Sequence, residues 1–104
     1  SKAPRDLRDL ARLFYIKHAA EPDIKTIKPL LADEKSPWIW HARIEAAVIE
    51  AKQNNYAKAI AYLDHFKNSP GVLLSLKQRG ENLRKLYEIK QAQKNTQATE
   101  TTGE

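Results

Sequence analysis

Apolar side chains recur along the chain at the three- and four-residue spacing of α-helices, and prolines divide this pattern into segments. Pro4, Pro37 and Pro70 are each 33 residues apart, and each follows a small residue. A proline in the first helical position, preceded by a small capping residue, is a typical helix start. A period of 33 to 34 residues is also the length of one helix–turn–helix unit in a helical-repeat protein. The three prolines therefore predict the starts of three successive units.

The pattern predicts five helices, and no segment alternates as a β-strand would. We expect helices near residues 4–19, 22–32, 37–53, 56–67 and 70–92. Pro29 falls inside the second helix and should kink or shorten it, whereas Asn54 and Asn55 should form a tight turn between the third and fourth. The predicted fold class is all-α, with antiparallel helix-hairpin repeats in an α–α superhelix and a long C-terminal capping helix.

The apolar positions of the first helix predict which of its faces is buried. Leu7, Leu10 and Phe14 lie on one face, and Leu13 and Ile16 lie off this stripe. We expect the stripe to enter the core. Leu13 and Ile16 should then be exposed, or should drive self-association into a homo-oligomer through the first or the fifth helix.

The fourth and fifth helices each carry one apolar stripe. These stripes consist of Tyr56, Ala59, Ile60, Leu63 and Phe66 in the fourth helix and of Leu73, Leu76, Gly80, Leu83 and Tyr87 in the fifth. Residues 91–104 hold no large apolar side chain, so burial cannot offset the entropy lost on ordering them. We therefore expect a helical domain over residues 1–90 and a disordered tail over 91–104.

Small residues fall where the third and fourth helices should face each other. Ala46 and Ala47 lie in the middle of the third helix and Ala59 lies in the fourth. Two antiparallel helices approach to about 8–10 Å only where small side chains meet. The first unit is a weaker copy of this arrangement, with Phe14 at the position of Ala47 and Thr26 at that of Ala59.

The order small, small, tyrosine, alanine in Ala46, Ala47, Tyr56 and Ala59 resembles the tetratricopeptide repeat. Residues 4–88 are similar to the C-terminal half of the YfgM-like tetratricopeptide-repeat proteins of alphaproteobacteria. The most distinctive matching pieces are residues 4–13, Leu30-Leu31 with Ser36-Pro37-Trp38, and Gln78-Arg79 ahead of a terminal helix.

The proteins of this family resemble the ancillary subunit of the Sec translocon and are anchored by one N-terminal membrane helix. The resemblance implies a protein–protein interaction module on the extracytoplasmic side of the inner membrane, close to the translocon or to envelope chaperones, with other proteins or peptides as partners. The anchor would lie outside these residues. The lack of methionine also predicts a processed chain or a piece of a longer one.

The first helix of each unit lines the concave side of a tetratricopeptide solenoid. The resemblance, aligned on Tyr56, then gives a candidate protein-binding groove of Arg8, Ala11, Tyr15, His18, His41, Ile44, Val48, Lys52, Lys77, Glu81, Arg84 and Lys85. This groove is apolar in the middle and basic on one side, which suits an extended peptide with acidic and apolar side chains. Some relatives clamp a terminal carboxylate with asparagines, but Tyr15 and Val48 occupy those positions here.

The sequence offers no catalytic or metal-binding pattern. It has no cysteine, and none of His18, His41 and His65 has another histidine three or four residues away. We find neither a Ser–His–Asp order nor a glycine-rich phosphate loop, so we expect no enzyme, no cofactor and no small-molecule substrate. Trp38 and Trp40 are two residues apart on a helix and should point in different directions. Either both pack in the core or at its edge, or one is exposed and anchors a partner.

The charge distribution bears on the alternatives to a peptide-binding module. The net charge is +5, but residues 1–35, 36–69 and 70–104 carry +2, +1 and +2, with acidic residues interleaved throughout. A phosphate-binding stripe would concentrate the excess on one face, which argues against a basic helical nucleic-acid-binding module. The other alternative is a purely structural solenoid segment that mediates self-association.

Overall fold

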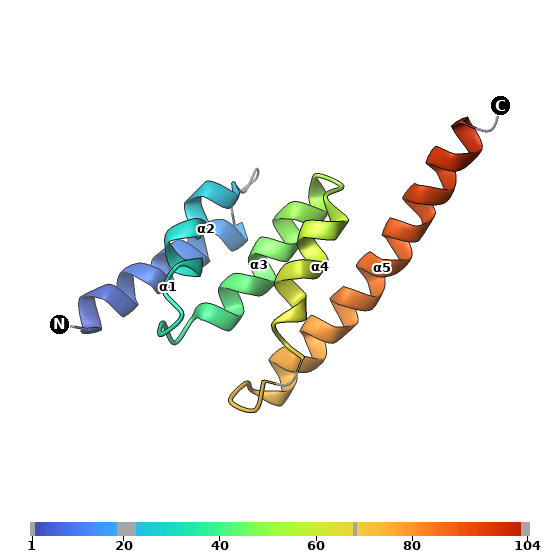
Figure 1. Cartoon of the computed structure of the whole chain (residues 1–104). Helices are drawn as coiled ribbons and strands as arrows, with labels where there is room; N and C mark the ends of the chain where they lie inside the picture. The colour runs from blue at the N-terminus through green and yellow to red at the C-terminus, as the bar shows by residue number, and fades with distance from the viewer. Residues whose placement is uncertain (1, 19–22, 68, 103–104) are drawn as a thin grey trace.

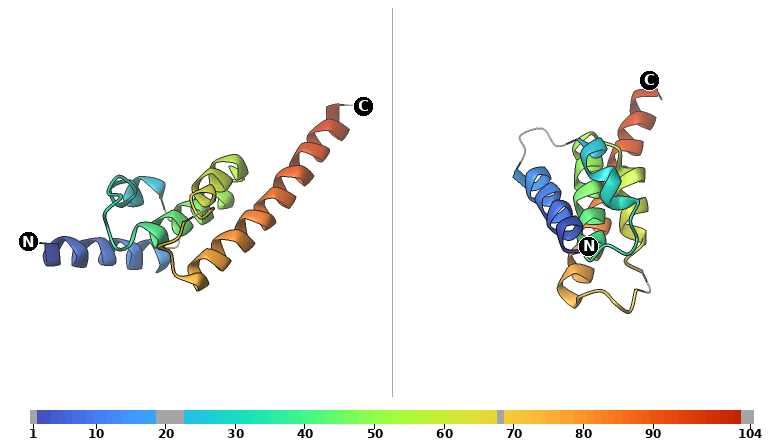
Figure 2. Two further views of the ribbon diagram at one scale, coloured as in Figure 1. Left: turned by 60° about the horizontal axis from the view of Figure 1, so that its bottom comes forward. Right: turned by 90° about the vertical axis from the view of Figure 1, so that its left-hand side faces the viewer.

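The computed structural model describes residues 2–18, 23–67 and 69–102, and within these residues it is all-α with five helices (Figure 1). The helices are α1 (Lys2–His18), α2 (Ile24–Leu31), α3 (Ile39–Lys52), α4 (Tyr56–Asp64) and α5 (Leu74–Thr102). They follow one another in a row, so the molecule is elongated, with dimensions of 61 × 31 × 20 Å. Figure 2 shows the row from α1 at one end to α5 at the other. The predicted helix number and class are confirmed.

Helix α3 is the centre of the molecule, because it packs against all four other helices. Helices α1 and α5 both pack on α3, but within the described residues they do not pack on each other. The sequence of α3 explains its position. Apolar and small side chains occur on more than one side of it, and those of Ile39, Ala42, Ile44, Ala46, Ala47 and Ile49 are buried. A helix with apolar side chains on several sides is stable where neighbours cover more than one of its faces.

Two apolar clusters meet at α3. The first joins α1, α2 and α3 through Leu13, Ile16, Ile27, Leu30, Ala42, Ala46 and Ile49. The second joins α3, α4 and α5 through Ile44, Ala47, Ala59, Leu63, Phe66 and Tyr87. Ala47 and Ala59 are fully buried in the same cluster, which confirms that these small residues lie between α3 and α4.

The described caps and turns between the helices follow the turn chemistry of the sequence. The Asp23 side chain accepts a hydrogen bond from the backbone N–H of Lys25 and caps α2. The Ser36 hydroxyl accepts one from the N–H of Trp38 at the entry to α3. Asn54 has a φ of 63° in the predicted turn before α4. The expected end of the first helix and start of the second, at residues 19–22, lie outside the described residues, whereas Pro29 lies in the last turn of the short helix α2.

The buried face of α1 is the opposite of the predicted one. Leu13 and Ile16 are 7% and 2% exposed, whereas Leu7 and Phe14 are both 66% exposed and Leu10 is 41% exposed. Helices α2 and α3 both pack against the side of α1 that holds Leu13 and Ile16, so the longer apolar stripe is left uncovered. The premise that Leu13 and Ile16 would drive self-association is therefore wrong.

A buried carboxylate accompanies this inner face of α1. Asp9 is 4% exposed, one turn before Leu13. The Ser36 hydroxyl donates a hydrogen bond to Asp9 Oδ2 at 3.4 Å, and the Arg12 guanidinium lies 3.9 Å from Asp9 Oδ1. These partners offset part of the cost of burying a charge. They also tie α1 to the loop before α3.

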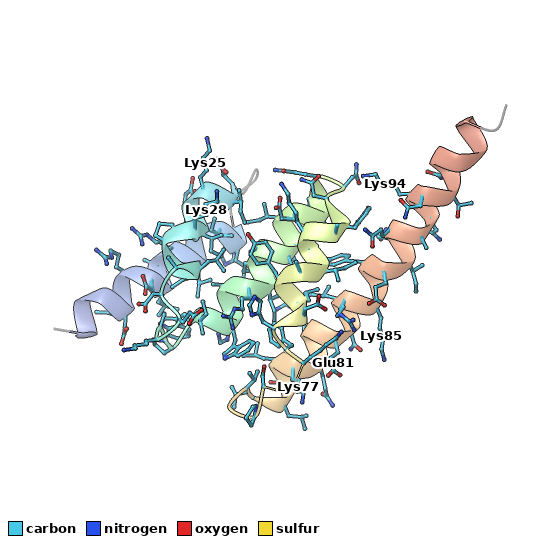
Figure 3. The ribbon with its side chains drawn as sticks, in the orientation of Figure 1. Lys25, Lys28, Lys77, Glu81, Lys85 and Lys94 are labelled. Carbon is cyan, nitrogen blue, oxygen red and sulfur yellow. The ribbon has the colours of Figure 1, made fainter. Side chains whose placement is uncertain are left out.

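Helix α5 differs from its prediction at both ends. It begins at Leu74, because residues 69–72 form a turn in which the N–H of Val72 donates to the carbonyl of Ser69. Leu73 therefore precedes the helix and is exposed. At the other end α5 continues to Thr102, through the segment predicted as a tail. The Lys94 ammonium donates to the carbonyl of Asn54 at 2.9 Å, beside the start of α4 (Figure 3).

Candidate protein-binding groove

A groove lies over α3, between α1 and α5. Because α1 and α5 pack on α3 and not on each other, the face of α3 between them is only partly covered. The groove has a volume of about 220 Å³ and a mainly apolar surface. It is lined by Leu10, Leu13, Phe14, Lys17, Trp38, His41, Ile44, Glu45, Leu76 and Arg79.

The floor and walls of the groove come from different helices. Ile44 of α3 is 1% exposed and belongs to the second apolar cluster, so the floor is fixed by core packing. Leu10 and Phe14 of α1 form one wall and Leu76 of α5 the other. The Phe14 ring also contacts His18, with 4.4 Å between the ring centroids. The walls therefore present large apolar side chains to solvent.

Trp38 and His41 form the end of the groove near the start of α3. Their rings meet edge to face with centroids 5.5 Å apart. Trp38 Nε1 and His41 Nδ1 are buried without a hydrogen-bond partner among the described residues. Burial lowers the pKa of His41, the positive charges of Arg79 and Lys17 lower it further, and Glu45 opposes them. The imidazole is therefore neutral at pH 7.

Charged side chains stand at the edges of the groove. Lys17 extends from α1, Arg79 from α5 and Glu45 from α3. Within the described part of the chain none of the three makes an ion pair. Two cations against one carboxylate give the groove a positive potential. Both cations also contribute to the lowered pKa of His41, of which burial is the main cause.

Of the residues that the sequence placed in a protein-binding groove, His41 and Ile44 line this one. Leu10, Phe14, Lys17 and Leu76 each come one position before a predicted residue, namely Ala11, Tyr15, His18 and Lys77. One residue is a rotation of about 100° around a helix. The groove therefore meets α1 and α5 about 100° around each helix from the predicted positions.

The other predicted residues lie elsewhere. Arg8, Tyr15 and Lys52 are exposed outside the groove, and Val48 is half-buried on α3. Arg84 is turned toward α4, where its Nε lies 2.8 Å from Asp64 and its terminal nitrogen 3.2 Å from Glu88. Figure 3 shows Lys77, Glu81 and Lys85 along the first half of α5. The structure thus brings together only two of the predicted positions.

Trp38 and Trp40 diverge as predicted, and both are half-buried. Trp38 packs against the first apolar cluster and lines the groove. Trp40 packs against the second cluster, with its ring 4.8 Å from that of Phe66 and the Arg43 guanidinium 4.5 Å from its centroid. Only Trp38 is therefore in a position to contact a molecule in the groove.

Among the side chains that the structure describes, those of residues 6–18, 23–67 and 69–97, no three or more histidines, aspartates or glutamates form a group that could hold a metal ion. No helix within those ranges combines the length and apolar character needed to span a bilayer. Comparison with protein-family models, curated proteins and solved structures finds no match for this chain.

Proposed function

We propose that the chain is a non-enzymatic protein–protein interaction module of the tetratricopeptide type, which binds a segment of another protein in the groove over α3. The observation that carries the proposal is the groove itself, with an apolar floor at Ile44 and solvent-exposed apolar walls at Leu10 and Phe14. An apolar hollow with a charged rim is typical of a surface that binds a protein partner.

The positions of buried residues support the repeat type. Asp9, Leu13 and Ile16 of α1 each lie 33 residues before a buried residue of α3, namely Ala42, Ala46 and Ile49. The packing order recurs as well, because α3 packs on α1 and α2 just as α5 packs on α3 and α4. A recurrence of both burial and packing at one period is what stacked helix hairpins produce.

The cellular setting is proposed from the family resemblance of residues 4–88. The module would act on the extracytoplasmic side of the inner membrane, near the Sec translocon or periplasmic chaperones, tethered by a helix outside these 104 residues. The full-length gene product tests the tether, since about 20 consecutive apolar residues upstream would support it. An upstream region without such a stretch would contradict it.

The protein-binding role is tested with a permanently unfolded client. We expect fluorescein-labelled, reduced and carboxymethylated α-lactalbumin to bind the 104-residue chain in a fluorescence-anisotropy titration. Phe14→Ala should weaken binding about tenfold, because it removes a central apolar wall. Tyr15→Ala is the matched control, since Tyr15 is equally exposed on the same helix but outside the groove. Equal affinities of the two variants, or no binding at all, would contradict the proposal.

Self-association is a second candidate, favoured by apolar side chains at both ends of the row. Leu7 of α1 is 66% exposed, and Leu86 and Ile89 of α5 are 44% and 57% exposed. Sedimentation velocity at rising protein concentration tests it. A dimer that Leu86→Ser and Ile89→Ser abolish would support self-association, and a monomer at high concentration would rule it out.

A further inference from the structure

We infer that the groove recognises an acidic peptide segment anchored by one large apolar side chain, with carboxylates on either side of the anchor pairing with Lys17 and Arg79. This inference rests on the proposed protein-binding function and adds the chemistry of the partner. It differs from a general apolar surface, because it specifies both the anchor and the charges beside it.

The size of the hollow favours a side chain as the anchor. Its volume of about 220 Å³ is below the ~300–1,000 Å³ of pockets that enclose small molecules or cofactors. The aliphatic and phenyl part of the lining consists of Leu10, Leu13, Phe14, Ile44 and Leu76. These side chains cannot donate or accept a hydrogen bond, so an aliphatic or aromatic side chain fits against this part of the groove.

The charges on the two walls favour carboxylates beside the anchor. Lys17 stands on the α1 wall and Arg79 on the α5 wall, so a peptide crossing the groove passes both. Elsewhere in the described chain the arginines near acidic residues are already engaged, Arg12 with Asp9 and Arg84 with Asp64. Lys17 and Arg79 are exposed and without an ion-pair partner among the described residues. A peptide carboxylate can therefore pair with them without displacing an existing partner.

The remaining polar groups of the groove do not favour a basic peptide. Glu45 is the single carboxylate in the lining. A lysine or arginine that bound Glu45 would share the groove with the two cations Lys17 and Arg79, which would repel it. The same arrangement suits a carboxylate near either wall, where the nearest charge is positive.

The experiment is a selection from a phage-displayed library of random 12-residue peptides on the immobilised 104-residue chain. We expect enriched peptides to carry a leucine, isoleucine, phenylalanine or tryptophan with aspartate or glutamate on both sides. Binding of a synthetic peptide with an enriched sequence is then measured by fluorescence anisotropy. Replacing its apolar anchor with serine should weaken binding about tenfold, and replacing both acidic residues with lysine should do the same.

Matched protein variants locate the charge contact. Arg79→Glu should weaken binding of the winning peptide about tenfold, and a peptide with lysine in place of its acids should regain affinity for this variant. Lys85→Glu is the control, because it makes the same charge change at an exposed position of α5 outside the groove. Circular dichroism checks that both variants keep the wild-type helix content.

The outcomes separate this inference from the function on which it rests. Enriched peptides without acids, or an equal effect of Arg79→Glu and Lys85→Glu, would overturn the acidic chemistry and leave peptide binding in place. The inference also fails if a 20-nucleotide single strand outcompetes the winning peptide. If no peptide is enriched although the unfolded client binds, the inference fails and the function stands. If neither binds, both fail.

Discussion

The two helix hairpins of the molecule share a 33-residue register and close differently. In the α3–α4 hairpin, Ala47 and Ala59 are fully buried between the helices. At the corresponding positions of the α1–α2 hairpin stand Phe14 and Thr26, and Phe14 is 66% exposed. A small side chain at this position allows two helices to meet, whereas a phenylalanine is too large for such a crossing and faces outward.

The outward position of Phe14 has a functional consequence. Phe14 stands where the second hairpin has Ala47, and its side chain forms part of an apolar wall of the groove. At the third position of this register Gly80 is buried, and the Phe66 ring lies against it. Of the three positions 14, 47 and 80, only position 14 holds a large residue, and it is the only one of the three that is exposed to solvent.

The largest expected effect compares the two faces of α1. Leu13→Ala should lower the free energy of unfolding by about 2–4 kcal/mol, because it leaves a cavity in the first apolar cluster. Leu7→Ala should change it by less than about 0.5 kcal/mol, since Leu7 is largely exposed. Urea unfolding followed by circular dichroism measures both. A larger loss for Leu7→Ala would mean that α1 buries the opposite face.

A substitution within the α3–α4 hairpin tests whether its two helices need a small residue between them. Ala47→Leu should destabilise the protein by about 1–3 kcal/mol, because no space is left between α3 and α4. Phe14→Leu, at the same register position in α1, should be close to neutral. Thermal unfolding of the two variants against wild type gives the comparison, and similar midpoints would show that the two hairpins are packed alike.

The two described glycines provide a smaller test of the approach between α5 and Phe66. A Cβ at position 80 would lie 2.9 Å from Phe66 Cγ, whereas a Cβ at position 71 would meet nothing within 4 Å. Gly80→Ala should therefore cost about 1 kcal/mol, despite the higher helix propensity of alanine. Gly71→Ala should be neutral or stabilise by up to about 1 kcal/mol. Equal stabilities, measured by urea unfolding, would contradict this close approach.

The smallest effect concerns pH. Burial, with the charges of Arg79 and Lys17, lowers the pKa of His41 below 6.5 in the folded protein, so the unfolded chain binds the proton more tightly. The contribution of His41 to stability is thus present above pH 6.5 and is lost as the pH falls toward the lowered value. Urea unfolding at pH 7.5, 6.0 and 5.0 should show a shallower decline for His41→Gln than for wild type. An unchanged slope would contradict the burial of this imidazole.

The helices and the close hairpin could be predicted from the sequence because their signals are local. The Asn54-Asn55 turn and the spacing of Ala47 and Ala59 are each read within a few residues. The prolines were a less accurate signal, because α1 begins at Lys2, α3 at Ile39 and α5 at Leu74 and not at Pro4, Pro37 and Pro70. The α5 extension was missed because glutamine, alanine and lysine are good helix formers, and they sustain a helix without an apolar stripe. A lack of large apolar residues was therefore a poor guide to the helix end.

The orientation of α1 could not be predicted from its own pattern. Both of its faces carry apolar side chains, and the buried one also holds Asp9, which the pattern assigns to the surface. The contact of Asp9 with Ser36, 27 residues away, involves a partner that local periodicity does not reveal. A comparison with the buried positions of α3 at the 33-residue offset would have identified the inner face. The groove residues of the outer helices were displaced by one position for the same reason.

The two tryptophans allow the most direct test of the groove as a binding surface. Trp38 lines the groove and Trp40 packs in the second cluster. Their indole N–H signals in a ¹H–¹⁵N correlation spectrum, assigned with Trp40→Phe, can be followed during titration with the unfolded client. We predict that the Trp38 signal shifts to saturation while that of Trp40 stays in place. Saturable binding that shifts only the Trp40 signal, or neither, would contradict the account.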